Sequence, residues 1–434
     1  MRRRKSFSLI IGVTLLSLLV SLLAACGGQA STPAPEAAAP TEAAAPPTEA
    51  PAPAAEATEA AEPAEAAAGA PVEITFWSWV PNIEAEVNDF NASQSEIKVN
   101  YVNAGGGNDQ YAKLKVAIEA QTDIPDVVQI EFQHLPSYIV RGDLLNLTDY
   151  GANEIKDQFV PWTWAQVSQG DGVYAYPQDA GPMIMMCNQE LLDKHGVAVP
   201  TTWDEFAAAA AKLHEADPNV YLSNFTADPG YFFGLLWQSG AHPFVVDGEN
   251  ITINFTSPEA MRVAELWGDL ISSGNLSPVD TFTNDWNTAL ANGSIACWTS
   301  GAWGPALIES AAKDQAGQWR VLPMPQWTAG GKVNGNWGGS TSVVMKATAH
   351  PKEAETFARW LNTDPQTVLD LTVSAALFPV TQPALSNPEW AGYKPDFWGG
   401  QETHKVMAEV AQQVDVSFAW SPFQDFVYTT YADE

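Results

Sequence analysis

The stretch VEITFWSW (residues 72–79) alternates between apolar and polar positions and is rich in residues that favour strands. Helical periodicity follows at residues 82–94 and 109–121, and strand patterns occur at 97–102 and 125–130. This β-α-β-α-β order predicts a mostly parallel sheet covered by helices. The predicted fold class is therefore α/β.

The rest of the folded part continues the alternation of strands and helices. Strands are predicted at 173–176, 183–187, 293–298 and 342–345, and helices at 190–195, 202–213, 258–273, 284–291 and 351–361. Thr202 and Glu205 have the spacing of a helix-capping box. Residues 72–434 are too many for one ordinary core and favour two lobes. No apolar run beyond the N-terminus reaches the roughly 18 residues of a membrane helix, so no internal span is expected.

The N-terminus has the pattern of a targeting segment. A basic run at residues 2–5 precedes an apolar run at 7–23, and the sequence LAAC then ends at Cys26. This resembles the bacterial lipobox, which implies that residues 1–25 are a signal peptide and that Cys26 is lipidated. A retained signal-anchor helix would not need a cysteine at this position. Residues 26–71 are mostly Ala, Pro, Glu and Thr, and we expect a disordered tether.

Charge and cysteine content exclude some classes of protein. The formal net charge is -31, so the basic surface that a nucleic-acid binder needs is absent. This acidity favours solubility, with a surface for cationic ligands as the less favoured interpretation. Besides Cys26, the cysteines are Cys187 and Cys297, whose distant spacing gives no disulfide signal. Two separate buried thiols are therefore favoured over a disulfide.

A series of motifs resembles, in the same order, the family 1 extracellular solute-binding proteins, the maltose-binding-protein-like receptors of ABC importers. The most specific is VPTTWDEF at 199–206, which is close to the family's Pro-x-Thr-Trp-Asp-Glu. The others are ITFWSW (74–79), IPDVV (124–128), VYAYP (173–177), MMCNQELL (185–192), SGAW (300–303), WGGS (337–340) and FARWL (357–361). The resemblance covers residues 72–425.

The resemblance implies a two-lobed, type II periplasmic-binding-protein-like fold with three crossover segments, near 175–183, 336–342 and 378–383. Lobe 1 would comprise residues 72–178 and 341–378, and lobe 2 residues 179–340 and 379–434. The ligand would lie in the cleft between the lobes and be trapped by hinge closure. Family members usually carry a further C-terminal helix after the position of Glu434, so the resemblance implies either a truncated C-terminus or a lobe 2 that lacks some packing.

The ligand expected from the residues is a carbohydrate. All 17 tryptophans lie in the folded part, and the apolar face of a pyranose packs on aromatic rings while its hydroxyls need polar partners. Trp79 follows the first strand, where α/β ligand sites gather, and paired glycines after Trp337 allow close backbone approach. The resemblance adds Trp303 as a stacking residue. The full set of predicted ligand-binding residues is Trp79, Glu131, Phe132, Asp179, Tyr231, Trp237, Trp303, Trp337, Gly338, Gly339 and Trp398.

Catalysis is not expected, because the common hydrolase and redox motifs are absent and the six histidines are scattered. No cofactor or metal is expected. The predicted function is an extracytoplasmic sugar receptor that delivers its ligand to an ABC importer permease. We expect a monomer that contacts the membrane only through its lipid anchor. The alternative is a non-sugar solute such as a polyamine, held by Asp179 and Glu131 in an aromatic box; a surface adhesin or a glycosidase is less favoured.

Overall fold

The computed structural model describes residues 70–248 and 250–433. The predictions for the signal peptide, the lipidation of Cys26 and nearly all of the tether therefore lie outside the described residues. No helix within the described ranges is both long and apolar enough to cross a membrane.

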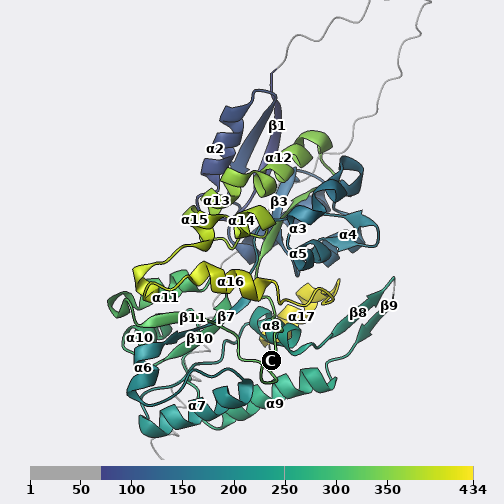
Figure 1. Ribbon diagram of the computed structural model, residues 1–434. Helices are drawn as coiled ribbons and strands as arrows, with labels where there is room; N and C mark the ends of the chain where they lie inside the picture. The colour runs from purple at the N-terminus through teal and green to yellow at the C-terminus, as the bar shows by residue number, and fades with distance from the viewer. Residues whose placement is uncertain (1–69, 249, 434) are drawn as a thin grey trace, which may run out of the picture. The chain divides into compact units, whose positions relative to one another are not determined.

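The first sheet has five strands in the order β2-β1-β3-β12-β6 (Figure 1). Strand β1 runs parallel to β2 and β3, while β12 runs antiparallel to β3 and β6. The parallel start confirms the predicted β-α-β-α-β order, with alternate residues of β1, such as Ile74 and Phe76, fully buried. The strands are β1 (Val72–Trp77), β2 (Ile97–Val102), β3 (Val127–Glu131), β6 (Tyr176–Pro177) and β12 (Ser340–Val344).

The second sheet has the strand order β10-β7-β11, with both outer strands antiparallel to β7 (Met183–Asn188). Every residue of β7 is buried, as expected for a central strand that is covered on both faces. Strand β11 (Trp319–Pro323) was not predicted, and β10 (Cys297–Gly301) begins later than the predicted strand at 293–298. The cause is a turn at Gly293, whose φ of 76° ends the preceding helix.

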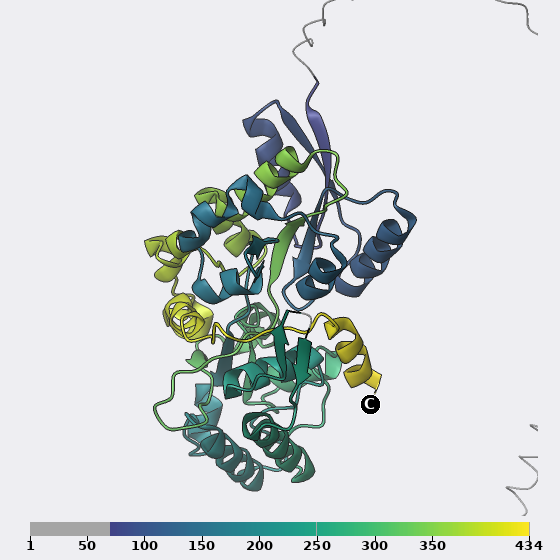
Figure 2. The same ribbon diagram turned by 90° about the vertical axis from the view of Figure 1, so that its right-hand side faces the viewer.

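Helices surround both sheets (Figures 1 and 2). Around the first sheet, α12 contacts β1, β3, β6 and β12. The capping box predicted at the start of α7 is present, with Thr202 accepting from the Glu205 backbone and Glu205 accepting from the Thr202 backbone. The α-helices are α2 (Glu84–Ser93), α3 (Gly107–Ala120), α4 (Leu135–Arg141), α5 (Pro161–Gln166), α6 (Gln189–Lys194), α7 (Trp203–Ala216), α8 (Pro229–Ser239), α9 (Pro258–Ser272), α10 (Asn284–Ala291), α11 (Pro305–Ala311), α12 (Pro351–Thr363), α13 (Pro365–Ser374), α14 (Gln382–Leu385), α15 (Pro388–Ala391), α16 (Thr403–Ala411) and α17 (Gln424–Asp433). Short strand pairs are β4 (Ser168–Gln169) with β5 (Gly172–Val173) and β8 (Phe244–Asp247) with β9 (Asn250–Ile253).

Three segments connect the two sheets and lie side by side. The Trp337 backbone N–H donates to the Gly181 carbonyl at 2.8 Å, and the Ala180 N–H donates to the Phe378 carbonyl at 3.3 Å. Asp179 also forms a β-bridge with Pro379. The structure confirms the predicted two-lobed α/β fold with three crossover segments. The residue limits assigned to each lobe stay a prediction.

Cys187 and Cys297 form a disulfide bond, so the favoured prediction of two separate thiols is wrong. The two residues are directly opposite each other in the antiparallel pairing of β7 with β10. This places their Cα atoms 4.1 Å apart, although 110 residues separate them in the chain. Strand register therefore brings the thiols together, and sequence spacing carries no trace of that register.

Glu86 on α2 is a buried carboxyl with only 4% of its surface exposed. Burial, together with the charges of Asp370, Asp89 and Asp364, raises its pKa from 4.5 to about 7. Between about pH 4.5 and pH 7, the Glu86 carboxyl is therefore still protonated in the folded protein but already ionised in the unfolded chain. The contribution of Glu86 to the free energy of unfolding should therefore fall as the pH rises from about 4.5 to about 7, and it should stay low at higher pH.

We expect Glu86→Gln to stabilise the protein at pH 8. At about 1.4 kcal/mol per pKa unit the rise from 4.5 to about 7 corresponds to roughly 3 kcal/mol, and solvent screening reduces this to on the order of 1–2 kcal/mol. The gain over wild type should largely vanish at pH 4, where both states of the wild type hold the proton. Urea unfolding at the two pH values measures this difference. Glu119→Gln, at an exposed position of α3, serves as the control. An equal gain at both pH values would contradict the ionisation argument.

Candidate functional site

The main cavity lies between elements of the two lobes and has a volume of about 640 Å³. One side comes from α3, the end of β3 and α4, which belong to the first sheet's lobe. The other comes from the start of α8, the crossover segment at 336–338, and α17. Tyr231 of α8 connects this second side to the second sheet, because its hydroxyl hydrogen-bonds Thr299 of β10 at 2.6 Å. The cavity therefore has the position expected of a ligand cleft.

Glu131 forms the centre of the cavity's first side, at the carboxyl end of β3. The Tyr111 hydroxyl donates to Glu131 Oε2 at 3.2 Å and accepts from the Glu131 backbone N–H at 3.0 Å. Burial, followed by the charge of Glu131, raises the pKa of Tyr111 well above its ordinary value. The phenol therefore remains a neutral donor that holds the Glu131 carboxylate in place.

His134 connects the two sides of the main cavity. Its ring packs on Tyr111 with centroids 4.3 Å apart, and Nε2 lies 3.7 Å from Glu131 Oε2. Its Nδ1 contacts Asp425 Oδ1 on α17. Tyr428, one turn further along α17, also faces these carboxylates, and burial together with the charge of Glu131 raises its pKa well above the ordinary value. The contact between His134 and Asp425 thus ties α17 to the first lobe.

Asp228 is the N-cap of α8, and it faces the cavity from the second lobe. Its Oδ1 accepts from the Tyr231 backbone N–H and from Trp337 Nε1, each at 3.1 Å. Both bonds use the same oxygen, so Oδ2 is available to accept hydroxyl groups of a ligand. An aspartate followed by proline and glycine is a common helix start, so the sequence signalled the cap but not its exposure to a cavity.

An aromatic cluster continues from the main cavity along the second lobe. The rings of Trp337 and Trp303 meet edge to face at 4.8 Å, and Trp303 Nε1 donates to the Trp337 carbonyl at 2.8 Å. Phe282 lies 6.2 Å from both rings and is 51% exposed. Its φ of 69° is in the left-handed region, which bulky residues rarely adopt. Such strain is typical of functional positions, and no sequence signal identified Phe282.

The structure brings only some of the predicted site residues into the main cavity. Glu131, Trp337 and Gly338 line it. Trp303 and Trp398 line a second cavity instead. Trp79 does not line the main cavity, but its ring lies 5.8 Å from that of the lining residue Tyr111.

Several of the other predicted residues have structural roles that remove them from the proposed site. Phe132, Tyr231 and Trp237 are fully buried, and Trp237 stacks on Phe418 at 4.4 Å while its Nε1 donates to the Asp415 carbonyl. A ring enclosed in this way cannot stack on a sugar. The sequence showed an aromatic stretch at 228–240, but only the helical structure of α8 decides which rings face inward.

Asp179 and Gly339 belong to the crossover region rather than to the cavity lining. Asp179 Oδ1 accepts from the Ser340 backbone at 2.7 Å and from the Ser340 hydroxyl at 2.6 Å, and burial raises its pKa. A Cβ at Gly339, whose φ is 93°, would lie 2.8 Å from the Ala180 Cα. The glycine therefore permits close approach of two crossover segments.

Most residues that line the main cavity were not predicted, because they are ordinary in sequence and meet only in the fold. Among them are Tyr111, His134, Asp228, Asp425 and Tyr428. Across the described ranges, no group of three or more His, Cys, Asp or Glu side chains is arranged to hold a metal ion.

Two α/β lobes with a polar and aromatic cavity between them define the class of two-lobed solute-binding proteins. Residues 77–368 match the family model of the bacterial extracellular solute-binding proteins, and the chain belongs to this family. This confirms the family predicted from the ordered motifs.

Proteins of known ligand resemble the chain over most of its length. An ABC transporter associated binding protein from B. animalis subsp. lactis Bl-04, solved with β-1,6-galactobiose, is 30% identical with a TM-score of 0.72 over 84% of this chain and 91% of that one. The lactose-binding protein of Rhizobium radiobacter is 25% identical over 79% of this chain and 82% of its own. The arabinooligosaccharide-binding protein of Halalkalibacterium halodurans is 24% identical, and the alignment spans 66% of each chain.

Proposed function

We propose that this protein is the sugar-binding receptor of an ABC importer and that the main cavity holds the sugar. The observation that carries the proposal is the composition of the cavity, where the carboxylates of Glu131, Asp228 and Asp425 lie among the rings of Trp337 and Tyr428. Carboxylates accept hydrogen bonds from sugar hydroxyls, and aromatic rings pack on the apolar C–H face. Its volume lies within the usual range for small-molecule sites, about 300–1,000 Å³.

Binding and release would be the whole activity of such a receptor. The sugar would first contact one lobe, and closure about the three crossover segments would add the groups of the other. The contact between His134 and Asp425 is involved in this closure, because it joins His134, the N-cap of α4, to α17 across the cavity. A sugar that enters between them would replace this contact with hydroxyl hydrogen bonds.

We further propose that the protein works outside the cytoplasm, held at the membrane by a lipid on Cys26, and that it delivers sugar to a permease. The support is the lipobox-like LAAC sequence after an apolar run, together with the extracellular family. Labelling of the full chain with an alkyne fatty acid would test the anchor. Label on the wild type but not on Cys26→Ser is expected, and equal label on both would contradict it.

A ligand panel tests the sugar proposal directly. The full protein is titrated by calorimetry with β-1,6-galactobiose, lactose and arabino-oligosaccharides, since these or their close relatives occupy similar proteins. A true ligand at 100 times its Kd should add about 2.7 kcal/mol to the stability of the protein. Absence of heat and of thermal stabilisation across a broad panel of mono- and oligosaccharides would overturn the proposal.

Asp228→Asn is expected to weaken sugar binding by about 10- to 100-fold, which corresponds to the loss of a charged acceptor worth about 1.5–3 kcal/mol. The amide oxygen still caps α8 and accepts from Trp337, so the helix should remain intact. Calorimetry with the sugar identified by the panel measures the change.

Asp364→Asn provides a matched control, because Asp364 is the N-cap of α13 and accepts from the Gln366 and Thr367 backbone N–H groups outside both cavities. This variant should bind sugar like the wild type. Equal affinity in Asp228→Asn and Asp364→Asn would place the sugar elsewhere.

A further inference from the structure

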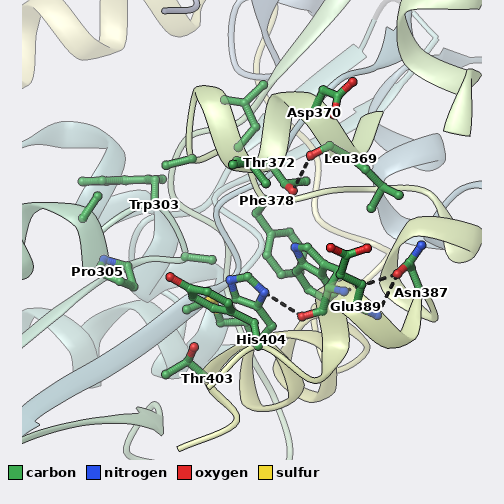
Figure 3. A pocket seen from close by; sticks show the side chains of 18 of the residues that line it. Trp303, Pro305, Leu369, Asp370, Thr372, Phe378, Asn387, Glu389, Thr403 and His404 are labelled. Carbon is green, nitrogen blue, oxygen red and sulfur yellow. Dashed lines mark hydrogen bonds between the residues drawn. The ribbon is translucent and has the colours of Figure 1, made fainter. Parts of the chain in front are cut away.

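The second cavity, drawn in Figure 3, has a volume of about 540 Å³ and shares no lining residue with the main cavity. It lies among α11, the end of α13, the segment 376–378, α15 and α16. Trp303 lines the second cavity, and Trp337 lines the main cavity. Because the two rings are in contact, this tryptophan pair lies between the two cavities. The sugar proposed above leaves the second cavity unexplained.

Aromatic side chains form part of the lining of the second cavity. His404, which is labelled in Figure 3, stacks on Trp390 and on Tyr393, with ring centroids 4.5 Å and 4.7 Å away respectively. Its Nδ1 lies 2.9 Å from the Trp390 carbonyl. Burial lowers the pKa of His404, so the ring is neutral at pH 7 and adds no positive charge to the cavity. Phe378 and Trp398 complete the aromatic lining.

The charged groups of the second cavity are all negative. Glu309, Asp370 and Glu389 line it, and no lysine or arginine is among the described residues that do. Glu309 is fixed by a hydrogen bond of 2.6 Å from Trp398 Nε1. Lys394 and Lys405 both contact Glu402, which is not among the lining residues, and Lys313, four residues after Glu309, does not line the cavity either. The carboxylates that face the cavity therefore lack a cation of their own.

We propose that the second cavity binds a small organic cation, such as a quaternary ammonium or polyamine group. Aromatic faces attract a cation through their quadrupole, and nearby carboxylates add direct Coulomb attraction. A bare metal ion does not fit, because no metal-binding cluster of side chains exists among the described residues.

Choline is the probe, and 3,3-dimethylbutan-1-ol, which has the same shape without the charge, is its matched control. Calorimetry with the full protein should show choline binding with a Kd on the order of 1 mM, weakened by added NaCl, and no measurable binding of the neutral alcohol. Spermidine tests whether a longer polyamine binds better. Equal binding of choline and the alcohol, or no binding of choline, tetramethylammonium and spermidine at high millimolar concentration, overturns the proposal.

Two variants locate the cation. Glu389→Gln removes an exposed carboxylate, and Tyr393→Leu removes a partly exposed ring. Each should weaken choline binding by about 5- to 10-fold, in keeping with one charge or one cation–π contact. Neither residue lines the main cavity, so sugar affinity should not change.

Glu119→Gln on α3, outside both cavities, should leave choline binding unchanged. Choline affinity that is unaltered in both Glu389→Gln and Tyr393→Leu overturns the site. A protein that binds sugar but no cation refutes only this inference, and one that binds choline but no sugar refutes only the proposed function.

Discussion

Replacing Trp337 with alanine is expected to lower the free energy of unfolding by about 3–5 kcal/mol, the usual cost of removing a buried tryptophan side chain. Trp337 is only 7% exposed, packs against Tyr231 at 5.2 Å and Trp303 at 4.8 Å, and donates to Asp228. Its truncation should also weaken sugar binding, because Asp228 then loses the partner that orients it. Urea unfolding and calorimetry measure the two effects.

The cost should be high because the surroundings of Trp337 cannot collapse easily. Glycines line its recess, since a Cβ at Gly230 would lie 2.8 Å from Trp337 Cδ1 and a Cβ at Gly234 would lie 3.4 Å from Trp337 Cβ. Positions without side chains have no atoms that could move into the space left by the indole.

Trp79→Ala is the control, because Trp79 is partly exposed and makes its aromatic contact with Tyr111 alone among the described rings. It should cost clearly less stability than Trp337→Ala. Trp337→Phe should recover part of the packing but not the hydrogen bond to Asp228. A loss below about 1 kcal/mol for Trp337→Ala, against the range usual for such truncations, would show that the recess is looser than its geometry implies.

Removing the disulfide by Cys187→Ala with Cys297→Ala is expected to lower the free energy of unfolding by about 2–5 kcal/mol. The bond joins residues 110 apart in the chain, so it closes a long loop and considerably lowers the conformational entropy of the unfolded state. Cys187 and Cys297 are fully buried where β7 pairs with β10. Little of the loss in stability should therefore come from a change in the solvent exposure of these two residues. The urea midpoint, measured with and without a phosphine reductant, reports the change.

The single variants distinguish a disulfide bond from two thiols that act independently. Either single substitution already breaks the disulfide, so each should cost nearly as much as the double, and the reductant should not destabilise the double variant further. Two single effects that simply add up to the double effect would mean that the cysteines act separately.

The proposed sites differ in how far the sequence could predict them. Glu131 and Trp337 were predicted because each follows a recognisable pattern, the end of a strand and a Trp-Gly-Gly motif. Asp425 and Tyr428 were missed, since they belong to α17 and reach the cavity only where that helix meets His134. Trp237 was predicted as well but does not line the main cavity, because an aromatic residue has the same sequence signal whether it faces a ligand or Phe418.

The order of strands and helices, the α/β class and the family could be predicted from the sequence, because hydrophobic period and capping residues act over a few neighbouring positions. Which side chains share a cavity and which cysteines bond could be seen only in the folded chain. Those outcomes depend on strand register and helix rotation, where a shift of one residue turns a side chain from the core to the cavity. The pairing of Cys187 with Cys297 and the convergence of Glu131, Asp228 and Asp425 are contacts of this kind.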